Sequence, residues 1–114
     1  MTTQDSISMT ACIAVCTECH RVCLETFRRC VEEGCAALQP SFAGLILVCA
    51  EMCQTSANAM IYAVAEHRHT CGACAALCSA CAERCASGEE SMFKVCAEVC
   101  RRCAEHCSRM QAMG

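Results

Sequence analysis

The chain has 114 residues, and 17 of them are cysteine. This length suits a single domain spanning 1–114. Because Leu, Ile, Val and Phe together supply only 19 residues, cysteine must also serve as a small buried hydrophobe. With one Pro, one Tyr and no Trp, the composition excludes a turn-rich all-β fold, and a net charge of −3 offers no basic face to a nucleic-acid partner.

The first residues lack both the basic and the apolar regions of a secretory signal peptide. We therefore expect a cytoplasmic protein whose thiols stay reduced, and the odd number of cysteines argues against a complete disulfide framework. The segment 42–65 is apolar apart from Glu51, but Gln54, Ser56 and Asn58 lie at its centre. Polar groups at that depth disfavour a membrane span, so we expect no membrane partner.

Most of the cysteines follow the spacing C-x3-C-x2-C-x3-C, which occurs three times. The copies are Cys12, Cys16, Cys19 and Cys23; Cys74, Cys78, Cys81 and Cys85, preceded by Cys71; and Cys96, Cys100, Cys103 and Cys107. Cys49 and Cys53 form a two-membered version. Steps of three and four place side chains on one face of an α-helix, whereas a strand would send them to both faces. The spacing therefore predicts helices, each with a cysteine stripe.

Residues typical of helix ends, which lie between the stripes, predict helices over 6–33, 41–66, 70–86 and 87–110. Gly34 is suited to follow the first helix as its left-handed cap, and Ser41 and Thr70 can cap the second and third. Ser87 and Glu90 have the spacing of a capping box for the fourth. Short loops imply antiparallel neighbours. We therefore predict an all-α, antiparallel four-helix bundle with a cysteine-lined core.

So regular a stripe of thiols indicates metal binding. If the cysteines only packed the core, they would be mixed with aliphatic residues along the stripe. A disulfide scaffold is also disfavoured, because neighbouring cysteines on one stripe cannot all pair with one another. An iron–sulfur electron carrier remains a minor alternative, because Cys71, Cys74 and Cys78 have a similar spacing, but ferredoxin motifs lie on loops rather than along a helix. Zinc and Cu(I) are the ions that thiolates favour.

The charge that each ion would leave in the core distinguishes zinc from Cu(I). Each zinc ion held by four thiolates leaves a net charge of −2, so four such sites would bury about eight negative charges in one small core. One Cu(I) per thiolate replaces one proton with one cation and keeps the core nearly neutral. This argument favours many Cu(I) ions, with a metallothionein-like buffer for zinc or mixed d10 metals as the main alternative. We see no catalytic triad, phosphate loop or paired carboxylates, so we expect no enzyme.

The two ends of the predicted bundle differ in composition. One end collects thioether and imidazole groups, from Met9, Met60, His67, His69, His106, Met110 and Met113, beside Cys12 and Cys71. The other end holds Cys30, Cys35, Cys85, Met92 and Phe93 and lacks histidine. Thioethers and imidazoles bind Cu(I) more weakly than thiolates do. We therefore expect copper to load through the Met/His end, with Met9, Met60, His67, His106 and Met110 as candidate ligands. His20 is expected on the surface.

Over residues 11–107 these motifs resemble the cytosolic copper storage proteins. The resemblance implies a four-helix bundle filled with Cu(I), assembled as a homotetramer. It carries a ligand role to Cys12, Cys16, Cys19, Cys23, Cys30, Cys49, Cys53, Cys71, Cys74, Cys78, Cys81, Cys85, Cys96, Cys100, Cys103 and Cys107. Some members have a His-rich loop before the last helix, but residues 87–91 contain no histidine here. Cys35 falls outside the stripe.

The second predicted helix has more apolar surface than one core needs. The run Leu45, Ile46, Leu47 and Val48 covers a whole turn, so part of it must face outward. Ile61, Tyr62 and Val64 extend that outer surface. We expect it to contribute to an interface between subunits.

Overall fold

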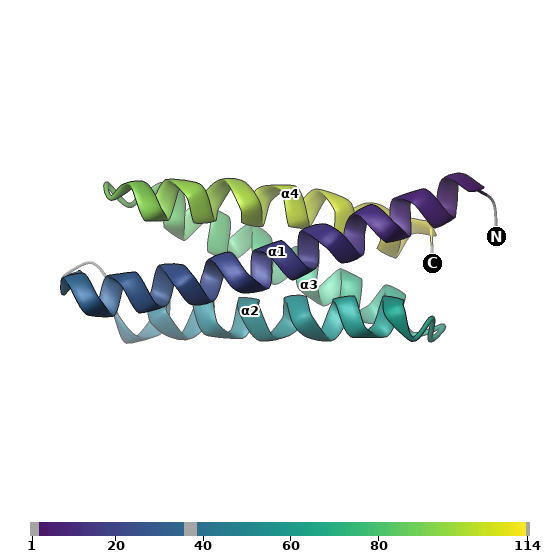
Figure 1. The fold of residues 1–114 in the computed structure, drawn as a ribbon, viewed down its shortest axis with the longest axis horizontal. Helices are drawn as coiled ribbons and strands as arrows, with labels where there is room; N and C mark the ends of the chain where they lie inside the picture. Colours follow the sequence, from purple (N-terminus) through teal and green to yellow (C-terminus); the bar gives the residue numbers. More distant parts are fainter. Residues whose placement is uncertain (1–2, 36–38, 114) are drawn as a thin grey trace.

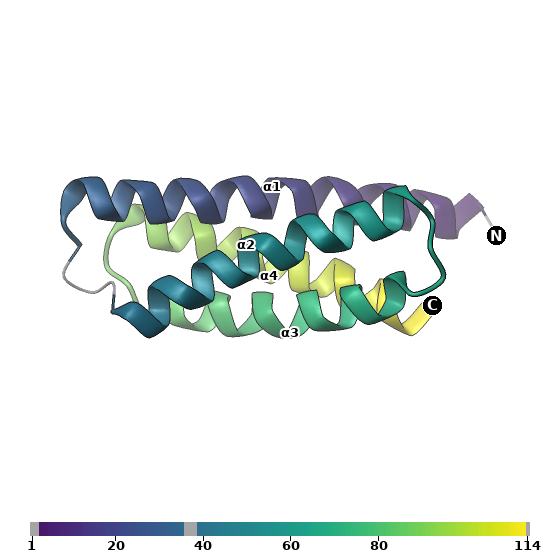
Figure 2. The same cartoon turned by 90° about the horizontal axis from the view of Figure 1, so that it is seen from below.

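The computed structural model describes residues 3–35 and 39–113, which form four helices: α1 (Thr3–Glu33), α2 (Pro40–Ile61), α3 (His67–Ala86) and α4 (Ser91–Met113). They make an elongated bundle of 47 × 18 × 18 Å (Figure 1). α1 and α3 each pack against both α2 and α4. Figure 2 shows that successive helices run in opposite directions. The predicted all-α four-helix bundle is confirmed.

α1 ends as its sequence predicts. Gly34 has φ +68°, in the left-handed region that favours glycine. The amide of Cys35 donates to the carbonyl of Cys30 at 2.9 Å, and that of Gly34 donates to the carbonyl of Val31 at 3.3 Å. These two bonds satisfy carbonyls that the last turn leaves free. The same helix begins at Thr3, three residues before the predicted start.

α2 is shorter than the predicted 41–66. It begins at Pro40 behind an extended Gln39, so Ser41 lies inside the helix rather than at its cap. It ends at Ile61 because Ala63 adopts φ 57° and turns the chain, and the amide of Val64 donates back to the carbonyl of Ala59 at 3.1 Å. Nothing in the sequence marks an alanine for this left-handed position.

The remaining caps also differ from the prediction. α3 begins at His67 rather than at Thr70, whose hydroxyl donates to the carbonyl of His67 at 2.9 Å within the first turn. The hydroxyl of Ser87 donates to the carbonyl of Glu83 at 3.3 Å, so Ser87 belongs to the end of α3. The predicted capping box is therefore wrong, and α4 begins at Ser91 and continues to Met113.

Each helix buries one stripe whose members step by three or four residues. On α2 and α4 the stripe is longer than the cysteine motif alone. The α2 stripe is Phe42, Ile46, Cys49, Cys53, Ser56 and Met60, and the α4 stripe is Phe93, Cys96, Cys100, Cys103, Cys107 and Met110. Cysteine thus occupies the middle of the bundle, and larger side chains lie at both ends of the stripes.

We call the end where α1 connects to α2 and α3 connects to α4 the aromatic end. The rings of Phe42 and Phe93 lie 5.5 Å apart there, and the guanidinium of Arg84 covers Phe42 at 5.0 Å from its ring centroid. The opposite end, where α2 connects to α3, we call the methionine end after Met60 and Met110, which are only 2% and 3% exposed. Both chain termini lie at this end (Figure 2).

Among the described residues, α2 is the one helix long and apolar enough to cross a membrane. Length and composition alone do not separate such a span from the core helix of a bundle. In the structure α2 packs against α1 and α3 and buries its stripe between them.

Candidate metal centre

The core of the bundle is a column of thiols. Within residues 3–35 and 39–113, fifteen cysteines are free, and each is 0% exposed. α1 and α4 contribute four each, α3 contributes five and α2 contributes Cys49 and Cys53. The predicted inward orientation of the cysteine stripes is therefore correct.

The sulfur atoms form overlapping groups in which all members lie within 4.8 Å of one another. In the described part of the chain these groups are Cys12, Cys71 and Cys107; Cys16, Cys74, Cys103 and Cys107; Cys19, Cys53, Cys78 and Cys103; Cys19, Cys23, Cys49 and Cys100; and Cys23, Cys81, Cys96 and Cys100. Each group shares at least one sulfur with the next. The column is continuous along the bundle, from the methionine end toward the aromatic end.

Contacts between sulfurs of different helices have distances that suit a shared ion. Cys16 and Cys107 lie 3.5 Å apart, and Cys49 and Cys78 also lie 3.5 Å apart. These separations exceed a disulfide bond of about 2.05 Å. Two sulfurs bound to one ion at about 2.3 Å can lie at most about 4.6 Å apart. The column can therefore take up thiophilic ions with little movement of the helices.

Hydrogen bonds and burial raise the pKa of one thiol at each end of the column. The hydrogen bond with Cys107 and burial raise the pKa of Cys71 above its ordinary value. At the other end of the column, the hydrogen bond with Cys81 and burial raise the pKa of Cys85. A metal ion binding either sulfur must displace a proton, so binding weakens as the pH falls.

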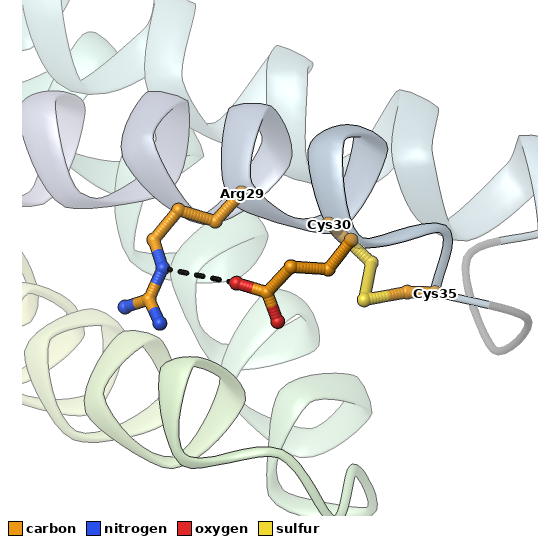
Figure 3. The surroundings of a disulfide bond; sticks show 4 residues. Arg29, Cys30 and Cys35 are labelled. Carbon is orange, nitrogen blue, oxygen red and sulfur yellow. Dashed lines mark ion pairs between the residues drawn. A yellow bond between two sulfur atoms is a disulfide. The ribbon is translucent and has the colours of Figure 1, made fainter.

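Cys30 and Cys35 form a disulfide where α1 ends (Figure 3). The expectation that all thiols stay reduced is wrong for this pair. Cys30 lies on the α1 stripe and is 1% exposed, but its sulfur is not a free thiol in this form. Its predicted role as a ligand therefore concerns only the reduced chain. Cys35 lies outside the helix, as its spacing predicts.

The candidate ligands at the methionine end are buried to different degrees. Met60 and Met110 belong to the core, and Met9 packs against it while remaining partly exposed. His67 is half-buried, and its Nδ1 is enclosed without a hydrogen-bond partner. His106 is half-buried and lines a cavity of about 470 Å³ together with Met110.

The prediction that His20 lies on the surface is wrong. The side chain is half-buried, and its Nδ1 lies 2.8 Å from the carbonyl oxygen of Ala50. This hydrogen bond joins α1 to α2.

Ser56 was overlooked as part of the site. It is 0% exposed, and its hydroxyl donates to the Sγ of Cys71 at 3.3 Å. A signal was available, because positions 49, 53, 56 and 60 repeat the steps of the cysteine motif.

Comparisons with known proteins agree with this geometry. The model of the copper storage protein (Csp) family matches residues 5–112. A solved structure from Nitrosospira multiformis is 36% identical, with a TM-score of 0.90 over 96% of this chain and 99% of that one. Cu(I)-bound copper storage protein BsCsp3 of Bacillus subtilis is 30% identical, with a TM-score of 0.87 over 91% of this chain and 98% of that one.

A cytosolic copper storage protein from Streptomyces lividans, solved with five coppers, is 28% identical, with a TM-score of 0.89. The alignment covers 97% of this chain and 98% of that one. No curated protein sequence matches the chain. The family match spans nearly all of the helical bundle and every cysteine stripe. The chain belongs to the copper storage protein family.

Proposed function

We propose that this protein stores Cu(I) in the cytoplasm by binding many ions along its thiol column. The observation that carries the proposal is the continuity of the sulfur groups, each of which shares a member with the next. A bridging sulfur can hold two ions, so a continuous column suits a store of many ions better than one isolated site. The glutamates that form ion pairs are at least 40% exposed on the bundle surface, where they pair with arginines. The proposed role is storage and includes no catalysis.

The charge of the filled core favours Cu(I) over zinc. In the part of the chain that the structure describes, the fifteen free thiols are fully buried, and no cationic side chain is buried with them to offset four-thiolate zinc sites. Burying unpaired charge is costly. Cu(I) replaces each thiol proton with one positive charge, and its preference for soft sulfur ligands fits this donor set. The sixteen stripe cysteines are the proposed ligands, with Cys30 available after reduction.

We further propose that copper loads through the methionine end. Met9, Met60, His67, His106 and Met110 supply weak, exchangeable donors there, next to the group of Cys12, Cys71 and Cys107. At the aromatic end the stripes of α2 and α4 end in Phe42 and Phe93, whose rings offer no ligand, and the one buried thioether among the described residues there is Met92, next to Phe93 in the sequence. Replacing Met9 and Met110 with leucine and His106 with alanine should slow loading more than it lowers capacity. Met52→Leu, a half-buried position on α2, is the control, and unchanged loading rates in the triple variant would contradict this step.

Exposed apolar side chains on α2 and in the turn that follows it support assembly of several subunits. Val48 is 47% exposed, Ile61 60%, Tyr62 79% and Val64 41%. Ile46 faces the core instead, as one residue of the apolar run must. We propose that these apolar side chains lie between subunits of a homo-oligomer, expected to be a tetramer. Light scattering on wild type and Tyr62→Glu would test it, since a buried charge at the interface should release smaller species.

Anaerobic titration of the reduced protein with Cu(I) tests the storage function. We expect thiolate-to-copper absorbance to grow until about one ion per free thiolate has bound. Saturation at one or two ions per chain would contradict storage. A parallel titration with zinc alone separates the main alternative, because a zinc or mixed-metal buffer would bind several zinc ions per chain, whereas a Cu(I) store should bind few. A visible colour after growth in iron would instead indicate an iron–sulfur protein.

A further inference from the structure

The stripe of α2 repeats the cysteine motif with two substitutions. Cys49, Cys53, Ser56 and Met60 step by four, three and four residues, the same steps as the three full motifs. Ser56 therefore stands where the other helices place their third cysteine, and it is as fully buried as the thiols. On this stripe the thiols stop at Cys53, halfway along the helix.

The hydroxyl of Ser56 is directed at the sulfur column. Thr17, Thr26 and Ser87 donate their hydroxyls to backbone carbonyls four residues earlier, at 2.9, 2.8 and 3.3 Å. This is the usual bond for a hydroxyl on a helix. Ser56 instead donates to the Sγ of Cys71 on α3 at 3.3 Å. Thr26 is the contrasting case, because it is also buried on a stripe but bonds only its own helix.

The thiol group beside Ser56 has one sulfur fewer than the others. The group next to Ser56 has three thiols, Cys12, Cys71 and Cys107, whereas each of the other four groups in the described residues has four. Cys107 also belongs to the next group inward, so this outermost group shares one of its three sulfurs. A neutral hydroxyl oxygen is a poor ligand for Cu(I), which selects soft sulfur donors.

We propose that Ser56 makes the outermost thiol group a copper-exchange site. It leaves one ligand position without sulfur, so an ion held there binds more weakly than ions in the four-thiol groups and is the first to leave. The inference rests on the proposed copper storage and specifies which end of the store exchanges its ions most readily, and why. Ser56 acts through the ligands around it and is not itself a ligand.

The test measures how fast a loaded chain gives up copper to excess bathocuproine disulfonate, an anaerobic chromogenic Cu(I) chelator. Wild type should release a small fast fraction, followed by a slow remainder. Ser56→Cys completes the group with a fourth thiol and should slow the fast fraction at least about tenfold, since even outer-shell contacts change metal affinity about 10- to 100-fold. Ser79→Cys is the matched control, because it adds an exposed thiol on α3 and should leave the fast fraction unchanged.

The reciprocal variant is Cys53→Ser, which moves a hydroxyl to an inner group and should enlarge the fast fraction. Circular dichroism confirms that each variant is folded, and if Ser56→Cys fails to fold, Cys53→Ser decides the question. Release unchanged in Ser56→Cys, or a fast fraction no larger in Cys53→Ser, would overturn the exchange site. Wild type that retains only one or two ions would instead refute storage itself, so the two failures are distinguishable.

Discussion

The sulfur column ends in different side chains at the two ends of the bundle. At the aromatic end, the rings of Phe42 and Phe93 pack against each other at a tilt, and a disulfide removes Cys30 from the set of free thiols. At the methionine end, Met60 and Met110 are buried and Ser56 bonds a thiol. Aromatic rings pack rigidly and bind no copper, whereas thioethers adapt their shape and can coordinate it weakly. The comparison fits our proposal that one end stabilises the bundle and that the other exchanges copper.

The largest expected effect tests whether the aromatic end carries the stability. Phe93→Ala should lower the free energy of unfolding of the reduced apoprotein by about 3–5 kcal/mol, because the ring is 0% exposed and its loss leaves a cavity. Met110→Ala, at the other end, should cost less, about 2 kcal/mol, since the neighbouring side chains there are more adaptable. Urea denaturation measures both. Equal losses would remove the distinction between the ends, and Val95→Ala, 54% exposed, serves as the control.

Opening the disulfide is expected to have the next largest effect. Cys30 and Cys35 are five residues apart, so the link closes a short loop, and reduction should cost about 2 kcal/mol of unfolding free energy. Before reduction, a thiol reagent in denaturant should count fifteen reactive groups, and after reduction all 17. Cys35→Ser should give sixteen. Seventeen reactive thiols without reductant would show that the bond is absent in solution.

Two glycines, one near each end, should respond differently to substitution by alanine. A Cβ at Gly88 would lie 2.6 Å from the ring of Phe93, which is fully buried, so Gly88→Ala should cost about 1–3 kcal/mol. At Gly72, near the methionine end, the nearest atoms belong to the flexible, exposed side chain of Gln111. Gly72→Ala should therefore stabilise α3 by up to about 1 kcal/mol. Thermal melts of the two variants moving in the same direction would contradict this difference.

The smallest effect concerns the caps of α1 and α2. Gly34, at the aromatic end, and Ala63, at the methionine end, both adopt positive φ. Gly34→Ala should destabilise the protein by about 1 kcal/mol, and Ala63→Gly should stabilise it by a similar amount, because only glycine enters this region without steric cost. Denaturation midpoints would measure both changes. A loss of stability in Ala63→Gly would mean that the methyl group of Ala63 contributes packing that outweighs its backbone cost.

The cysteine stripes could be predicted from sequence because their spacing matches the helical period along every helix. Helix ends could not, since the left-handed turn at Ala63 and the backward hydrogen bond of Ser87 depend on the folded backbone. The disulfide was missed because Cys35 lies off the stripe and its partner was assigned to the metal. The place of Ser56 on the α2 stripe was visible in the spacing, but its bond to Cys71 required the packed helices.

A crystal structure of the copper-loaded protein, with copper located by anomalous scattering, tests the central claim most directly. We predict copper peaks in a row inside the bundle, from the group of Cys12, Cys71 and Cys107 to that of Cys23, Cys81, Cys96 and Cys100. Occupancy should be lowest at the first of these groups, next to Ser56. Copper bound only to surface histidines and methionines, with the thiol column empty, would contradict the account.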